Sequence, residues 1–203
     1  MRFPMRTGPS SRARATRLLL LVSCAFSLSA CGVASIAPIV PWSAQEFDST
    51  LVGTWENPED GSTAVVTGEN PPDYVVLFTD DDGKLAHFDA RLGRLGAHRV
   101  LDLAPNASAL GDQSALYQSL LLPLHSFVVI DRVTAGELIF RMVEPDSLDH
   151  LLRRNPGVVA HRPGQGEMGP VLTAETPEVR RFFAELIRRP GVLGETQRFV
   201  RRQ

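Results

Sequence analysis

The sequence predicts a mainly β fold (α+β): an antiparallel curled sheet or small β-barrel with a C-terminal amphipathic helix packed on it. Three observations lead to this prediction. Short runs of β-branched and aromatic residues with period-two alternation fill the region from residue 51 to 143. Turn residues separate these runs at short intervals, as in neighbouring antiparallel strands. The clearest helical periodicity comes late, around residue 180.

Seven segments in this region are expected to be strands. They are residues 51–56, 63–67, 74–79, 84–92, 98–103, 127–133 and 137–143. In 84–92, every second residue from Ala86 to Leu92 falls on one face, which is therefore predicted to be buried. Asp80-Asp81-Asp82-Gly83 precedes this segment. Three adjacent aspartates lack the alternate-position spacing of a calcium loop, so they predict a hairpin turn with Gly83 at positive φ.

Two helices are expected after the strands. Thr176 is predicted to be the N-cap of the longer one, with Pro177 at its first position and Pro190-Gly191 ending the run. Its apolar stripe consists of Val179, Phe182, Phe183, Leu186 and Ile187. This stripe must cover the sheet or plug the open end of a barrel. A shorter helix is expected over 146–154, with Leu148, Leu151 and Leu152 inward.

The N-terminus has the order of a secretory signal. Five arginines precede the first acidic residue, and an uncharged run of 13 residues follows from Leu18 to Ala30. A transmembrane helix needs about 20 apolar residues, so this run is too short to be one. We therefore expect residues 1–30 to be a signal peptide. Residues 31–47, with two prolines and little periodicity, are expected to be a lipidated N-terminus and flexible tether, and residues 48–203 a single β-rich domain.

Leu28-Ser29-Ala30-Cys31 resembles the lipobox of bacterial lipoproteins. The resemblance implies that Leu28, Ser29 and Ala30 are recognised by the lipoprotein signal peptidase, and that Cys31 carries lipid and anchors the chain to a bilayer. Gly32 in place of Asp is similar to lipoproteins sorted to the outer membrane, facing the periplasm, if the organism is Gram-negative. The alternative is an ordinary secretory signal cut after Ala30, which would leave Cys31 as the one thiol of the mature chain.

Removal of the signal would make the protein more acidic. The signal holds five of the 21 basic residues and none of the 23 acidic ones, so 16 basic and 23 acidic residues remain. An acidic, exported chain argues against binding to nucleic acid. Most of the basic residues lie after residue 150. They could face anionic lipid or a protein partner, or could be the solvated face of a helix followed by a frayed tail.

Gly53-Thr54-Trp55 resembles the G-x-W motif that opens the first strand of lipocalins. The resemblance implies an eight-stranded barrel that encloses an apolar molecule, with a late basic residue, Arg198 or Arg201, packed over Trp55. The residues it places in the pocket or at the closed end are Trp55, Tyr74, Phe78, Phe88 and Phe140. The alternative is that Trp55 is a core residue of another small β fold. Together with 101–105 and 122–127, the motif also resembles uncharacterised exported bacterial proteins.

The sequence offers little support for catalysis. The five histidines, His87, His98, His125, His150 and His161, are scattered and match no metal-binding spacing. Asp146 and His150 could share one helix face, but two ligands do not make a metal site. His125-Ser126 suggests a hydrolase, although neighbours in a strand point to opposite faces. We expect no metal and no cofactor.

Three hypotheses about function follow. The first is a non-catalytic envelope lipoprotein that binds an apolar small molecule or a protein partner. The second is a lipocalin-like lipid carrier. The third is an envelope hydrolase with its site near His125.

Overall fold

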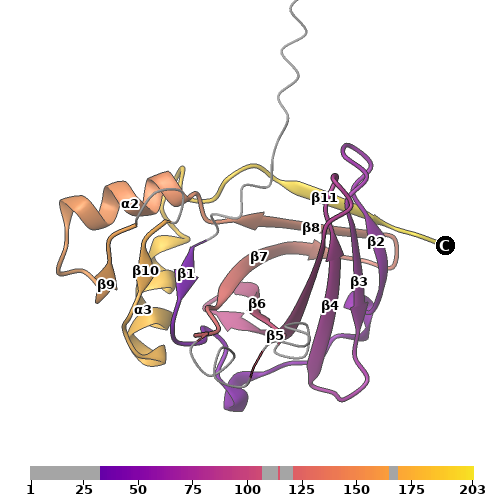
Figure 1. Cartoon of the computed structure of the whole chain (residues 1–203), viewed down its shortest axis with the longest axis horizontal. Coiled ribbons are helices and arrows are strands. Elements are labelled where there is room, and N and C mark those ends of the chain that lie inside the picture. The colour runs from indigo at the N-terminus through magenta and orange to yellow at the C-terminus, as the bar shows by residue number, and fades with distance from the viewer. Residues whose placement is uncertain (1–32, 107–113, 115–120, 165–168) are drawn as a thin grey trace, which may run out of the picture.

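The computed structural model describes residues 33–106, 114, 121–164 and 169–203 (Figure 1). The strands are β1 (Ala34–Ser35), β2 (Gly53–Glu56), β3 (Thr63–Thr67), β4 (Asp73–Thr79), β5 (Leu85–Leu95), β6 (His98–Pro105), β7 (Ser126–Val133), β8 (Glu137–Met142), β9 (His161–Arg162), β10 (Val171–Leu172) and β11 (Gln197–Arg201). The helices are η1 (Trp42–Ala44), η2 (Ser49–Leu51), α2 (Pro145–Arg154) and α3 (Thr176–Leu186).

Eight strands form a closed antiparallel barrel in the order β11-β2-β3-β4-β5-β6-β7-β8. The predicted fold class is confirmed. The register places Trp55 opposite Ala64, Ala64 opposite Phe78, and Phe78 opposite Ala86. These residues therefore share the inner face. The turn before β5 has Gly83 at φ 79°, as predicted.

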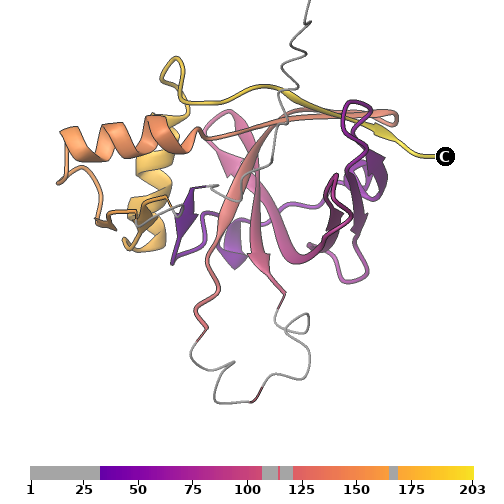
Figure 2. The same ribbon diagram turned by 45° about the horizontal axis from the view of Figure 1, so that its top comes forward.

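A second layer lies beside the barrel in two views of the molecule (Figures 1 and 2). It contains α2, α3 and the small sheet β1-β10-β9. The five predicted stripe residues of α3 are buried, and Phe183 packs edge-on against Phe127 of β7 with ring centroids 4.2 Å apart. This core is separate from the barrel interior, so α3 covers the outer face of the barrel and does not plug it.

The chain from Val33 to Val52 runs down the outside of the barrel and is part of the fold. Val33 is 4% exposed, and Ile39 and Val40 are fully buried. The buried carboxylate of Asp102 on β6 accepts the amide protons of both Ile39 and Val40, at 2.6 and 2.9 Å. The prediction of a flexible tether is therefore wrong from Val33 onward, because backbone pairing and apolar burial fix this segment.

Two further predictions need correction. Thr176 is the first residue of α3 and not its cap, and its hydroxyl donates to the carbonyl oxygen of Pro38 at 2.9 Å. The frayed basic tail is wrong as well. Residues 197–201 form β11, which pairs with β8 on one side and β2 on the other and so closes the barrel.

Candidate functional site

The two ends of the barrel differ. The floor is the end at which β2 and β6 begin. The mouth is the opposite end, at which β4 and β6 end and β5 and β7 begin. The short helix η2 lies just before β2, at the floor. Its residue Leu51 is buried in the barrel core and accepts a hydrogen bond at its carbonyl oxygen from the indole Nε1 of Trp55, at 2.8 Å. Trp55 itself is fully buried, so it closes the floor from inside.

Arg201 completes the floor. Its guanidinium lies over the Trp55 ring, with Cζ 4.2 Å from the ring centroid. It donates to the carbonyl oxygens of Thr50 and Val52 at 2.6 and 2.7 Å, and Nε donates to that of Ala135 at 2.6 Å. Of the two arginines considered from the sequence, the structure places Arg201 on Trp55. Arg198 instead forms an exposed ion pair with Glu137.

Gly53 is required by this arrangement. Its φ of 147° is rare for residues with a side chain, and a Cβ atom there would lie 2.0 Å from Nη1 of Arg201. Three carbonyl groups hold that guanidinium, so it cannot easily move away. Gly53, Trp55 and Arg201 therefore form one unit that joins β2 to β11.

A polar cluster supports the floor beside Trp55. The hydroxyl of Tyr74 accepts from the amide of Asp48 at 2.6 Å, and Arg99 pairs with the Asp48 carboxylate at 2.7 Å. Burial raises the pKa of Tyr74. Burial alone would also raise the pKa of Asp48, but hydrogen bonds from Thr50 and Arg99 outweigh it and lower that pKa. Near neutral pH Tyr74 therefore keeps its hydroxyl proton and Asp48 is ionised.

The inner face becomes more exposed toward the mouth. Along β5, Leu92 and Ala90 are 0% and 1% exposed, whereas Phe88 is partly exposed. Along β4, Tyr74 is buried and Phe78 is partly exposed. The partly exposed hydrophobic residues that pack on the apolar barrel core are Val52, Ala64, Phe78, Phe88, Leu101, Leu103, Val133 and Phe140, of which Val52 and Val133 lie at the floor. The barrel interior is thus lined mainly by apolar side chains, which along β4 and β5 become more exposed from the floor toward the mouth.

The residues predicted for the pocket divide accordingly. Trp55 and Tyr74 are buried at the floor, where they close the barrel. Phe78, Phe88 and Phe140 lie among the partly exposed apolar residues. Only this second group can meet a ligand that enters from the mouth.

His125 contacts Asp102 on the outer surface of the barrel. Its Nδ1 lies 2.7 Å from the carboxylate, and its backbone pairs with that of Ser35 in both directions, at 2.8 and 2.9 Å. Ser126 is opposite Leu103, so it lies on the inner face and away from this pair. The hydroxyl of Ser35 donates to the carbonyl oxygen of Ala37. The His125–Asp102 pair therefore holds the segment from Val33 to Val40, and of its two serine neighbours Ser35 bonds elsewhere through its hydroxyl and Ser126 faces the interior.

The other polar candidates are dispersed. Asp80 uses its carboxylate to accept the amide of Lys84 within the hairpin turn, and Asp82 pairs with the Lys84 ammonium. His161 bonds to the carbonyl oxygen of Val159. Within the described part of the chain, no group of three or more His, Cys, Asp or Glu side chains is placed to hold a metal ion.

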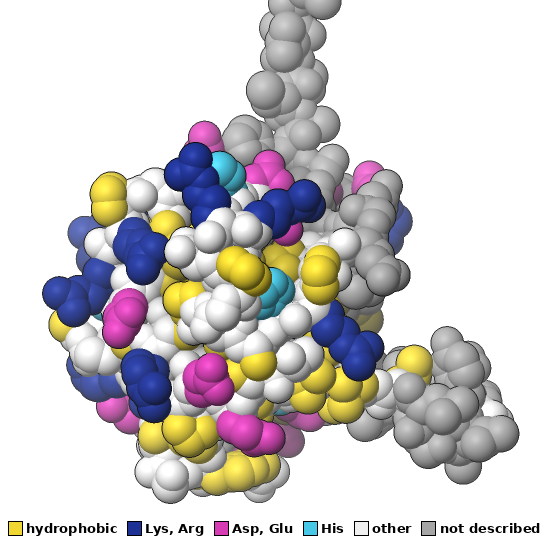
Figure 3. All heavy atoms as spheres, turned by 90° about the vertical axis from the view of Figure 1, so that its left-hand side faces the viewer, with side chains coloured by type: hydrophobic (Ala, Val, Ile, Leu, Met, Phe, Trp, Pro, Cys, Tyr) yellow, Lys and Arg dark blue, Asp and Glu magenta, His cyan; other side chains and the backbone are white. Residues whose placement is uncertain are grey.

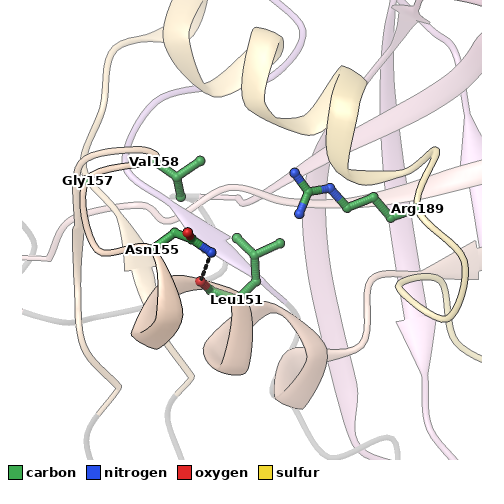
Figure 4. A pocket seen from close by; sticks show the side chains of 5 residues that line it. All are labelled: Leu151, Asn155, Gly157, Val158 and Arg189. Atoms are coloured by element: carbon green, nitrogen blue, oxygen red, sulfur yellow. Dashed lines mark hydrogen bonds between the residues drawn. The ribbon is translucent and has the colours of Figure 1, made fainter.

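A separate surface pocket of about 560 Å³ lies between α2 and the end of α3 (Figure 4). It is lined by Leu151, Asn155, Gly157, Val158 and Arg189. Asn155 is turned back onto its own helix, where its amide donates to the carbonyl oxygen of Leu151 at 3.4 Å. None of the residues selected from the sequence as a ligand or catalytic site lines this pocket, so the barrel interior is the better candidate.

Comparison with known proteins gives no relative. No protein-family model matches the chain, and no curated protein or solved structure matches it. The function must therefore be inferred from the barrel itself.

Cys31 and the lipobox residues Leu28, Ser29 and Ala30 lie outside the described residues. Among the described residues, no helix is long and apolar enough to cross a bilayer.

Several residues that hold the floor and the outer segment could not be recognised from the sequence. Asp48 and Arg99 are 51 residues apart, and neither belongs to a recognisable motif. The contact of Asp102 with the amides of Ile39 and Val40 depends on the tertiary fold and follows from no local pattern. Arg201 was one of two candidates, because position in the sequence alone does not tell which arginine reaches Trp55.

Proposed function

We propose that this protein is a lipid-anchored protein of the bacterial cell envelope whose barrel binds an apolar small molecule, in the manner of a lipocalin. The observation that carries the proposal is the gradient of exposure along the inner faces of β4 and β5. Tyr74 and Leu92 are buried toward the floor, and Phe78 and Phe88 are partly exposed toward the mouth. An eight-stranded barrel has an interior suited to one small ligand.

The floor supports the lipocalin-like part of the proposal. The G-x-W resemblance implies a basic side chain over the tryptophan, and Arg201 occupies that position. Small inner residues support it too, because Ala64 and Ala86 flank Phe78 across the sheet and take up little of the interior. The lipobox resemblance at Cys31 supports anchoring to a bilayer.

The His125–Asp102 pair gives less support for a hydrolase. Catalysis by a serine needs a hydroxyl within hydrogen-bond reach of the imidazole. Ser126 faces the barrel interior, and Ser35 bonds to Ala37. The roles assigned to these side chains by their contacts are structural, so we favour ligand binding.

The test is a binding measurement on the Cys31→Ser chain, which carries no lipid of its own. The probe is cis-parinaric acid, detected by energy transfer from tryptophan. Phe88→Asp places a carboxylate on the partly exposed inner face and should weaken binding about a hundredfold, because an unpaired charge in an apolar site is strongly unfavourable. The control is Leu85→Asp on the same strand, since Leu85 points outward and is 67% exposed.

Equal binding by both variants would show that the probe does not enter the barrel. Solvent extraction of the native protein, followed by mass spectrometry, gives a second measurement. A barrel that releases no small molecule and binds neither cis-parinaric acid nor any of a panel of lipids would overturn the proposal.

A further inference from the structure

We propose that the pocket between α2 and the end of α3 is a second binding site, which takes a small carboxylate with a short apolar chain. This inference does not rest on the function proposed for the barrel. Three features of the pocket carry it: open space of a suitable size, an arginine side chain that reaches into it, and apolar walls.

The space in the pocket suits a small ligand. Its volume is about 560 Å³, and pockets that hold small molecules commonly measure about 300 to 1,000 Å³. One wall is the turn that follows α2, which contains Gly157. A Cβ atom at position 157 would have no atom of a non-neighbouring residue within 4 Å. The glycine therefore leaves room that a side chain would fill.

Arg189 brings a positive charge to the pocket. Its side chain reaches from the end of α3 toward Leu151 and Val158 (Figure 4). Within the part of the chain that the structure describes, its guanidinium has no ion pair and no hydrogen-bond partner, whereas Arg153 on α2 is paired with Asp149. A guanidinium presents a planar fork of N–H donors that matches the two oxygens of a carboxylate. Arg189 is thus free to bind one.

The charge around the pocket favours an anion. Residues 149–158 and 186–192 include all the lining residues and hold four arginines and one acidic residue, Asp149. The carbonyl ends of α2 and α3 carry partial negative charge, and these arginines lie in or just after the last turns, where they offset it. On this face of the molecule, basic side chains lie among hydrophobic ones (Figure 3).

The apolar walls distinguish the site from one for an inorganic anion. Val158 is 39% exposed, and Leu151 is partly buried and packs on the core of the helical layer. A hydrocarbon chain laid against these two side chains would remove apolar surface from water on both partners. Phosphate and sulfate have no such surface. A carboxylate on Arg189 with an alkyl chain on Leu151 and Val158 uses all three side chains.

The test is a titration of the full-length chain carrying Cys31→Ser, followed by heteronuclear NMR of its amide groups. The probe is hexanoate, and the comparison compounds are acetate, which lacks the chain, and hexan-1-ol, which lacks the charge. The amides of Gly157 and Val158 report on the pocket, and those of β4 and β5 report on the barrel. We expect hexanoate to shift the Gly157 and Val158 signals with a Kd about tenfold below that of either comparison compound.

Two arginine variants test the charge. Arg189→Met removes the guanidinium and keeps an apolar side chain, so the Kd for hexanoate should rise about tenfold and approach that for hexan-1-ol. Arg188→Met is the matched control, because Arg188 is also exposed and adjacent but does not line the pocket. It should change the Kd less than about twofold, as expected for a screened surface charge.

Two glycine variants test the space. Gly157→Leu should also raise the Kd for hexanoate about tenfold, because the new side chain occupies the pocket. Gly136→Leu is the control: it lies between β7 and β8, and a Cβ atom there would likewise have no non-neighbouring atom within 4 Å. Binding should be unchanged in this variant.

Failure of this inference can be told from failure of the proposed function. Shifts confined to β4 and β5 would mean that hexanoate enters the barrel, which would overturn the second site and leave the first proposal standing. No shift at Gly157 and Val158, or equal weakening by Arg188→Met and Arg189→Met, would overturn it as well. If hexanoate binds at Gly157 while cis-parinaric acid does not bind, the second site stands and the barrel is not a ligand site.

Discussion

Arg201 has more roles than any other side chain at the floor. It covers Trp55, it donates to the carbonyl groups of Thr50, Val52 and Ala135, and it occupies the space that a side chain at position 53 would need. A cation over an indole contributes about 0.5 to 2 kcal/mol, and each hydrogen bond about 0.5 to 1.5 kcal/mol. A single residue thus stabilises the closure of the barrel.

We predict that Arg201→Met lowers the free energy of unfolding by about 2 to 3 kcal/mol, since it removes these contacts and leaves carbonyl groups unpaired. Arg198→Met is the matched control on the same strand. Its exposed ion pair with Glu137 should contribute less than about 1 kcal/mol. Urea denaturation of both variants measures the difference, and an equal loss of stability would show that Arg201 has no special role.

At the scale of elements, the segment from Val33 to Val52 is where the sequence was least informative. Its prolines and small residues are typical of a linker, and its order depends on partners far along the chain: Asp102, His125 and Thr176. The alternation in β5 and the stripe of α3 were predictable, because burial there follows the local period. Strand β11 has five residues, too short for its pattern to stand out from a basic tail.

We predict that Asp102→Ala frees this segment. The amides of Ile39 and Val40 lose their acceptor, and a buried hydrogen bond to a charged group contributes about 1.5 to 3 kcal/mol. Hydrogen exchange of these two amides should accelerate. Asp131→Ala on β7 is the control, since its ion pair with Arg141 is partly exposed. Unchanged exchange in Asp102→Ala would mean that apolar packing alone holds the segment.

At the scale of the whole molecule, the barrel was predictable as a class, whereas its closure was not. The pairing of strands that follow one another in the sequence can be predicted from turns and alternation. The pairing of β2 with β11 cannot, because it joins positions almost at opposite ends of the domain. For the candidate site, the aromatic residues selected from the sequence all lie in or against the barrel core. The sequence could not say which of them face the mouth, because that depends on how strands of different length are staggered around the barrel.

From the proposed lipid attachment at Cys31, we predict that Cys31→Ser abolishes firm membrane attachment and leaves the fold intact. Residues 33 to 47 are held by contacts with the barrel and helices and not by the anchor, so the unfolding midpoint should not change. Cell fractionation measures attachment, and circular dichroism measures the fold. Retention of the variant in the membrane fraction after a high-salt wash would contradict the assignment of Cys31.

Closure by β11 also has a kinetic consequence. Arg201 bonds to Val52, 149 residues earlier, so the last seam forms only after nearly the whole domain is available. Until then β2 and β8 are open edges with unpaired backbone groups, which can pair with other chains. Contacts between residues so distant in sequence also slow folding. A chain that emerges from its N-terminus across a membrane would spend this interval exposed, and the yield of folded protein should depend on how quickly residues 197 to 201 follow the rest.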